Sequence, residues 1–303
     1  MSADGVPVAG SRDAAASNVR ASMLVLAAFA VFSGTDAIVK LLAIELPVAE
    51  VTFLVTTVAF LLLVLDTVVR GKVKRLVPRQ PRLALLRALL LAGDTLLIHY
   101  AFAMLPMSEA YLLAFLTPVI VAVLSAVLLQ ERLSSAGWLG VLLGFAGVAV
   151  ALRPDVWSLN LGHAAAVGSA LVFALSLILL RFAKAQESDE ALVAALLLVL
   201  MPLSLSAAYL SGRLIEPTPF HLLLVCVGGL ALLAGHALLV RAFRIGEASI
   251  VAPFQYSQII WGCIYGLLLF AAPIEIHTLV GAGIIILSGW LVLRKSAEKS
   301  CAH

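Results

Sequence analysis

The sequence predicts an all-α membrane protein of ten transmembrane helices, arranged as two inverted five-helix repeats with both termini cytoplasmic. Its composition, the length of its apolar runs and a repeated pattern all favour this fold class. Hydrophobic residues make up 63% of the 303 residues and charged residues 12%, and the mean hydropathy is +1.11. Because a soluble domain is closer to half apolar, this composition excludes an ordinary soluble protein.

Apolar runs long enough to cross a bilayer follow one another along almost the whole chain after Arg20. An α-helix needs about 20 residues to span roughly 30 Å of hydrocarbon. We expect helices at 21–43, 48–69, 84–105, 108–130, 136–152, 162–182, 191–211, 219–243, 249–271 and 276–294. Residues 1–20 are predicted to form a polar N-terminal tail without a removable signal peptide, and residues 296–303 a C-terminal tail.

Two stretches, 101–150 and 242–291, carry the same apolar pattern, offset by 141 positions as from residue 101 to residue 242. The matched positions include Ala101-Phe102 and Ala242-Phe243, Gly140 and Gly281, and Lys40 and Arg181. A unit that crosses the bilayer an odd number of times is inverted when it is duplicated. We therefore expect two oppositely oriented repeats, at 21–153 and 160–295, with a cavity between them.

Basic residues predict the orientation of the chain. With a cytoplasmic amino terminus, all of the 20 lysines and arginines except Lys40, Arg153 and Arg213 fall in inner segments. This agrees with the positive-inside rule and predicts a multi-pass protein of the inner, cytoplasmic membrane. The dense cluster at 70–82 is foremost a topological signal, with contact to anionic membrane lipid as the alternative. The net charge of +3 arises in these inner loops and indicates no nucleic acid partner.

The sequence lacks the motifs of several other function classes. No GxxxxGK[ST] loop is present to hold a nucleotide, so any transport must be driven by a gradient, with protons as a candidate coupling ion. An intramembrane enzyme or a scaffold is the distant alternative. The sequence contains no HExxH or GxSxG motif that would support an enzyme. Cys226, Cys263 and Cys301 lack the spacing of a metal site or a disulfide framework. We expect no catalytic residues, no cofactor and no metal.

Three segments carry a resemblance to a known family. They are Ala110-Tyr111-Leu112-Leu113-Ala114-Phe115-Leu116-Thr117-Pro118, then Leu128-Leu129-Gln130-Glu131-Arg132-Leu133, and Trp138-Leu139-Gly140 through Gly147-Val148. In these segments the chain resembles the drug/metabolite transporter superfamily, in its ten-helix EamA-type branch, over residues 21–295. The second half departs from the pattern, because Ala272 matches Glu131 and Ile259 matches Pro118.

The resemblance implies an alternating-access carrier for small metabolites, often an exporter of amino acids or related compounds. We expect a secondary-active or facilitative carrier that exports amino acids, aromatic or apolar ones among them, or related small metabolites. Uptake of a vitamin or an organic cation is the alternative. Few acidic residues line the expected cavity, which disfavours a dedicated cation carrier.

Ionisable residues in mid-membrane are the first candidates for a binding site, because a charge at the centre of a helix costs about 2.5–3.5 kcal/mol on insertion scales. Asp94 lies near the middle of the third predicted helix, and Arg87 lies seven residues earlier on the same face. The repeat offset sets His236 of the eighth helix opposite this region. We expect Asp94 and His236 to bind substrate and Arg87 to gate or couple. Asp94 would serve as an anchor for a substrate ammonium group or as a proton-coupling site. The alternative for Asp94 is a structural tether between helices.

Helix one carries a second candidate group, Ser33, Asp36 and Lys40, on one face. The i,i+4 spacing of Asp36 and Lys40 predicts an ion pair that neutralises itself. Its function would be an outer gate, and a purely structural pair is the alternative. Glu131 closes the fourth helix at the cytoplasmic side, and the resemblance implies a structural cap or an inner gate there.

Two helix faces rich in aromatic residues are expected to line the cavity. They are Gln258, Trp261 and Tyr265 in the ninth helix and Tyr111, Phe115 and Pro118 in the fourth. Amide hydrogen bonding beside aromatic surface suits a small organic ligand with an apolar side chain or a ring, and the proline marks a bending point. Packing against lipid or a neighbouring helix is the alternative.

Glycines in the fifth and tenth helices predict a close helix contact. They are Gly140, Gly144 and Gly147, and Gly281, Gly283 and Gly289. The contact would lie within one chain or, in the alternative, between two copies, so the protein is expected to be a monomer or a homodimer.

Overall fold

A computed structural model describes residues 9–104, 107–131, 133–152, 159–182, 187–210, 212, 214–271 and 274–301. Its α-helices are α1 (Ala9–Leu42), α2 (Val48–Val69), α3 (Pro81–Met104), α4 (Met107–Ala114), α5 (Thr117–Leu128), α6 (Ser135–Leu152), α7 (Leu161–Phe182), α8 (Asp189–Leu210), α9 (Pro219–Ile245), α10 (Ala248–Val251), α11 (Ser257–Phe270) and α12 (Ile276–Cys301). Two 3₁₀ turns, η1 (Val73–Leu76) and η2 (Ala252–Tyr256), complete the described part, which holds no strand.

Within the described residues, six helices are long and apolar enough to cross a membrane. They are Ala16–Leu42, Val48–Val69, Ala110–Leu128, Leu161–Arg181, Asp189–Leu210 and Pro219–Ile245, and Gly137–Leu152 and Ile276–Leu291 are shorter apolar helices. Large apolar side chains such as Leu61, Val127 and Leu268 stay exposed along the bundle. Such a surface suits lipid rather than water. The all-helical membrane fold is thus confirmed, and ten crossings stay a prediction.

Helix starts follow from local sequence. Pro219 fits the first turn of α9 because a first-turn residue needs no amide hydrogen for the helix. Thr218 caps α9 and forms a capping box with His221, whose backbone amide donates to the Thr218 hydroxyl.

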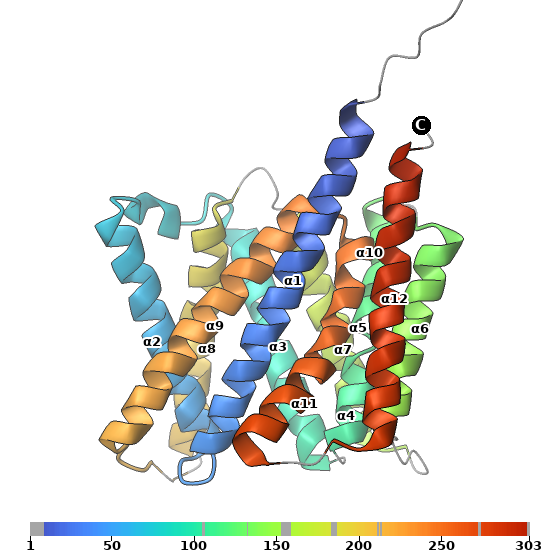
Figure 1. The fold of residues 1–303 in the computed structure, drawn as a ribbon. Coiled ribbons are helices and arrows are strands. Elements are labelled where there is room, and N and C mark those ends of the chain that lie inside the picture. The colour runs from blue at the N-terminus through green and yellow to red at the C-terminus, as the bar shows by residue number, and fades with distance from the viewer. Residues whose placement is uncertain are drawn as a thin grey trace, which may run out of the picture.

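The helices run side by side between two ends of the bundle (Figure 1). The basic segment 70–82, which contains η1, lies at the end of the bundle where α1 begins and α12 finishes. We name this end the basic end. The other end is the opposite end. Both ends of the described chain therefore lie on one side, as an even number of crossings requires.

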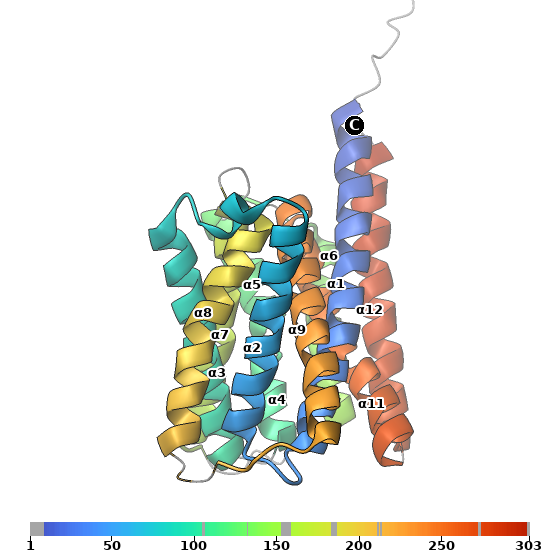
Figure 2. The ribbon, with the colours of Figure 1, turned by 90° about the vertical axis from the view of Figure 1, so that its left-hand side faces the viewer.

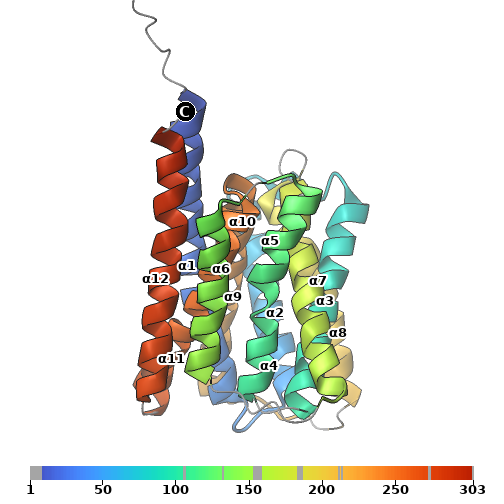
Figure 3. The ribbon, with the colours of Figure 1, turned by 90° about the vertical axis from the view of Figure 1, so that its right-hand side faces the viewer.

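The packing of helices is the same when the two halves are exchanged. α1 packs against α9, and its counterpart pair is α7 against α3. α2 packs against α8, which is its counterpart in the other half, and α6 packs against its counterpart α12. Figures 2 and 3 show these pairs from opposite sides. This self-matching pattern is the structural expression of the sequence repeat.

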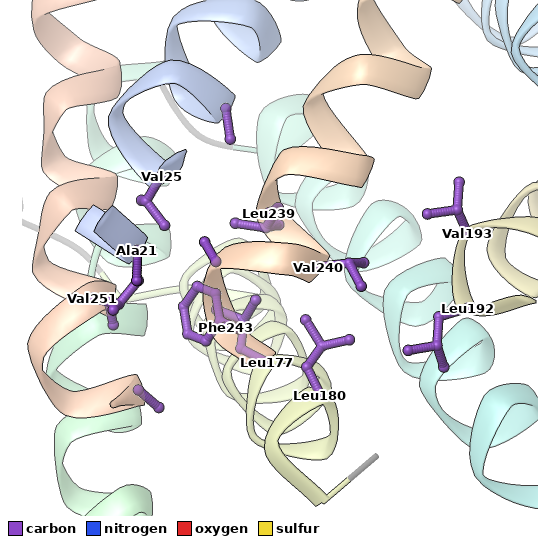
Figure 4. Packing of buried hydrophobic residues seen from close by; sticks show 14 of the residues in the cluster. Ala21, Val25, Leu177, Leu180, Leu192, Val193, Leu239, Val240, Phe243 and Val251 are labelled. Carbon is purple, nitrogen blue, oxygen red and sulfur yellow. The ribbon is translucent and has the colours of Figure 1, made fainter. Parts of the chain in front are cut away.

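The largest core cluster joins both halves near the basic end (Figure 4). Val25 of α1, Leu180 of α7, Leu192 of α8 and Phe243 of α9 are all buried within it. These side chains converge where α7 and α9 end and where α8 begins. The basic end is therefore closed by apolar packing between the repeats.

Two of the expected helix limits are wrong at the termini. α1 begins at Ala9 rather than at residue 21, and α12 continues to Cys301 instead of ending at 294. In the third turn of α1, Ser17 Oγ donates to the Ile245 carbonyl at 2.5 Å and Asn18 forms two hydrogen bonds with Glu247. Ser17 and Asn18, which were expected in the tail, thus bind α1 to the end of α9 and to the residue before α10.

Two helices expected to be continuous are broken. The span expected at 108–130 divides into α4 and α5, with Pro118 in the first turn of α5. The span expected at 249–271 divides into α10, η2 and α11, with Pro253 inside η2. Proline cannot donate a backbone hydrogen bond, so each break falls beside one. The two breaks occupy corresponding helices of the two halves.

The glycine contact forms within one chain. Gly147 of α6 and Gly281 of α12 face each other so closely that a Cβ on Gly281 would lie 2.5 Å from the Gly147 carbonyl oxygen. Gly144 leaves room for the ring of Tyr256, which a Cβ would approach to 2.4 Å. Gly283 has open space around it. The close α6–α12 contact was correctly predicted.

Candidate functional site

A polar cluster joins α1 to α11 towards the opposite end of the bundle. The Gln258 side-chain amide donates to Asp36 Oδ2 at 3.2 Å, and Ser33 Oγ donates to the Gln258 carbonyl at 3.3 Å. Tyr111 of α4 lies within electrostatic range of Asp36. The Asp36 side chain is exposed although it lies in a membrane-spanning helix. Because a carboxylate facing lipid is costly, the Gln258 amide on α11 is a favourable partner for Asp36.

The expected ion pair between Asp36 and Lys40 is wrong. Lys40 Nζ instead lies 4.5 Å from the ring centroid of Phe270, in a cation–π contact. Asp36 takes the Gln258 amide as its partner. An isolated helix favours the i,i+4 pair, but the packing of α11 on α1 supplies both residues with other partners.

The predicted face of α11 turns towards α1 rather than towards lipid. Tyr265 Oη lies close to the backbone of α1, because a Cβ on Gly34 would be 3.2 Å from it. Trp261 Nε1 is buried and hydrogen-bonds to none of the described residues. With Gln258, these side chains supply amide and indole groups to the interface between the halves.

A row of contacting aromatic side chains connects the two broken helices. The ring centroids of Tyr111 and Phe115 lie 6.2 Å apart, and those of Phe115 and Tyr256 lie 6.3 Å apart. Tyr256 is fully buried and its hydroxyl donates to the Val141 carbonyl at 3.4 Å. The breaks of the two repeats therefore meet at Phe115 and Tyr256. Sequence reasoning missed Tyr256, although its place three residues after Pro253 was a signal for a second broken helix.

Asp94 forms a link between α3 and α7. Ser169 Oγ donates to Asp94 Oδ1 at 2.5 Å. Within the described residues, no hydrogen bond or ion pair joins Asp94 to Arg87 or His236. The three residues thus do not form one cluster, because the carboxylate of Asp94 accepts a hydrogen bond from Ser169 on the neighbouring helix.

Arg87 and His236 have different direct neighbours. Arg87 is 1% exposed, and its Nη1 donates to the Leu192 carbonyl at 3.4 Å. His236 lies within electrostatic range of Arg87 and packs edge-on against Phe32, with ring centroids 4.9 Å apart. Phe32 and Asp36 are one turn apart on α1, so α1 connects this pair to the Asp36 cluster.

Glu131 holds three elements together at the basic end. Its carboxylate pairs with Arg181 Nη2 at 3.0 Å and accepts from the backbone amides of Ala248 and Ser249 at 3.3 and 3.1 Å. The Ser249 hydroxyl donates to it as well, at 3.0 Å. The end of α5, the end of α7 and the start of α10 thus meet at one carboxylate. A role as a cap or an inner gate stays a prediction.

Comparison with known proteins agrees with this architecture. The model of the EamA-like transporter family matches residues 19–153 and 160–294. A riboflavin transporter of Vibrio cholerae is 27% identical over 64% of this chain and 65% of its own length. An S-adenosylmethionine uptake transporter of Rickettsia bellii is 27% identical over 84% of this chain and 86% of its own.

A pseudopaline exporter of Pseudomonas aeruginosa is 29% identical over 91% of this chain and 96% of its own length. A solved crystal structure with 20% identity superposes with a TM-score of 0.79 over 91% of this chain and 98% of its own, which shows a shared fold. Both halves of the chain match one family model in turn, as the repeated helix packing requires. The chain belongs to the EamA-like transporter family.

Proposed function

We propose that this transporter works by alternating access between its two repeats, with its basic end in the cytoplasm of the cell and ten crossings of the inner membrane. The repeats extend over 21–153 and 160–295, and α4 with α5, like α10 with η2 and α11, makes one crossing. The observation that carries the proposal is the meeting of both broken helices at Phe115 and Tyr256. Broken helices at the interface of inverted repeats are where carriers of this kind bind substrate.

The proposed substrates are amino acids, aromatic or apolar ones among them, or related small metabolites, moved outward. Tyr111, Phe115, Trp261 and Tyr265 offer aromatic surface, and Gln258 offers amide hydrogen bonds. Export is named for the pseudopaline relative and uptake for the S-adenosylmethionine relative. Uptake of a vitamin or an organic cation is therefore the second candidate, and the riboflavin relative favours it.

Counterflow in proteoliposomes tests this function. Vesicles preloaded with a mixed amino-acid pool should accumulate a labelled amino acid saturably, above vesicles without protein. Accumulation of labelled riboflavin or of an organic cation instead would favour the second candidate. A well-folded preparation with no flux for any of these compounds would contradict the carrier.

Asp94 is proposed to couple transport to protons in addition to linking α3 to α7. Asp94→Asn keeps an oxygen that accepts from Ser169 but removes the titrating group. We expect counterflow to persist in this variant, and accumulation driven by a pH gradient to fall to the level of protein-free vesicles.

Ser169→Ala is the matched control for the link, because it removes the hydrogen bond and leaves the carboxyl group. It is expected to lower stability by about 1 kcal/mol while accumulation driven by the pH gradient persists. An Asp94→Asn carrier that still accumulates substrate at the wild-type rate would leave Asp94 as a tether alone.

A further inference from the structure

Arg87 carries a guanidinium whose hydrogen-bond donors are only partly used. It is 1% exposed, between α3 and α8, and Nη1 donates to the Leu192 carbonyl at 3.4 Å. Nε and Nη2 are buried and hydrogen-bond to none of the described residues. A buried charge without a partner is costly, so a protein keeps one where a ligand or a partner charge meets it.

The two free nitrogens form one edge of the planar guanidinium. Their parallel N–H groups match the spacing of two oxygens on one carbon or phosphorus atom, which is the geometry of bidentate carboxylate or phosphate recognition. A neutral ligand with a single acceptor would leave one of the two donors unpaired. The free edge of Arg87 is thus shaped for an oxyanion.

The acidic side chains around Arg87 have other partners. Four carboxylates lie on α3, at the start of α8 or in the segment before it. Their partners are Ser169 for Asp94, Arg244 for Asp189, Arg75 for Glu190, and the backbone amides of Arg79 and Gln80 for Glu187. Within the described residues, none of these forms an ion pair with Arg87, so its charge is left for a ligand.

His236, which lies within electrostatic range of Arg87, supplies a second buried polar atom. Its Nδ1 is buried and hydrogen-bonds to none of the described residues. The ring lies against Phe32, one turn from Asp36, whose carboxylate is exposed. Phe32 therefore connects the His236 ring to the part of α1 that carries Asp36.

We propose that Arg87 binds the anionic group of the transported substrate, a carboxylate or a phosphate, through Nε and Nη2, with His236 as a second contact. This inference rests on the carrier function proposed above and narrows its substrates to small organic anions and zwitterions. It assigns Arg87 to substrate recognition rather than to gating or coupling.

Ligand-induced thermal shifts of the purified full-length protein test the inference. The probes are L-phenylalanine, 3-phenylpropanoate, phenyl phosphate and phenethylamine, which share a ring and differ in charge. We expect at least one anionic or zwitterionic probe to raise the melting temperature, and phenethylamine to have no effect. Phenylpropanoate against phenyl phosphate distinguishes a carboxylate from a phosphate site. Arg87→Met should weaken the apparent affinity of the active probe roughly 10- to 100-fold.

The matched control is Arg82→Met, which removes an exposed arginine from the same helix and should leave probe binding unchanged. Without ligand, Arg87→Met should melt at or above the wild-type temperature, because it removes a buried unpaired charge. The inference is overturned if Arg87→Met melts well below the wild type, if it binds anions as the wild type does, or if no anionic probe acts on the wild type.

Counterflow of a labelled amino acid separates this inference from the carrier function. Flux that persists in Arg87→Met contradicts the anion site and leaves the carrier standing. Probe binding that Arg87→Met abolishes, in a protein without any flux, supports the site and contradicts the carrier.

Discussion

Replacing Glu131 with glutamine is expected to destabilise the protein and to open its basic end. The carboxylate is 8% exposed and Arg181 is 15% exposed, so the substitution leaves a buried arginine without its counter-charge. Removing one partner of such a pair costs about 3–5 kcal/mol, and the apparent melting temperature should fall by roughly 5 °C or more. The α10 amides that Glu131 accepts from also lose a charged acceptor.

Opening is measured at Val251, which is buried at the end of α10. A Val251→Cys probe, in a chain whose native cysteines are replaced by serine, should react faster with a maleimide when Glu131→Gln is added. The increase would show that the ion pair keeps the repeats closed. A lower melting temperature with unchanged labelling would reduce Glu131 to a structural cap.

Glu190→Gln is the matched control for Glu131→Gln. Its pair with Arg75 lies at the same end at 3.3 Å, but the Arg75 side chain is 55% exposed. An exposed pair contributes at most about 1 kcal/mol, so this variant should melt and label as the parent does.

The sequence was a reliable guide where a property depended on composition or on a long periodic pattern. The helices, the repeat and the α6–α12 contact all follow from apolar runs and glycine spacing, which act through local geometry and close packing. Glu131 was placed at a cap or gate from a resemblance, and its partners Arg181 and Ser249 came only from the structure. Arg181 matches Lys40 in the repeat, yet Arg181 forms an ion pair and Lys40 a cation–π contact.

Side-chain partners were the part that the sequence predicted poorly. Asp36 and Lys40 were expected to pair because they share a helix face, but each found a partner on α11. Helical spacing predicted that Asp94 would lie beside Arg87, but Asp94 accepts a hydrogen bond from Ser169 on α7 instead. Helical spacing determines which residues share a face of one helix, whereas partners depend on which helix packs there.

Gly281→Val is expected to remove most of the folded, monodisperse protein. A Cβ at this position would lie 2.5 Å from the Gly147 carbonyl oxygen and 2.8 Å from the Ala151 backbone nitrogen. Backbone atoms cannot move aside as a flexible side chain does, so α6 and α12 must separate. Overpacking of this kind typically costs about 1–3 kcal/mol, and contacts with backbone fall at the upper end. Fluorescence-detected size exclusion and a thermal melt measure the loss.

Gly283→Val is the matched control, since it makes the same change on the same helix where nothing lies within 4 Å of the new Cβ. It carries the same change in helix propensity and should fold as the parent does. Ala151→Gly should rescue Gly281→Val only in part, because it removes the Ala151 Cβ at 2.6 Å and leaves both backbone contacts. Equal behaviour of the two valine variants would contradict the close α6–α12 contact. A shift in elution volume without a fall in melting temperature would instead place Gly281 between two copies of the chain.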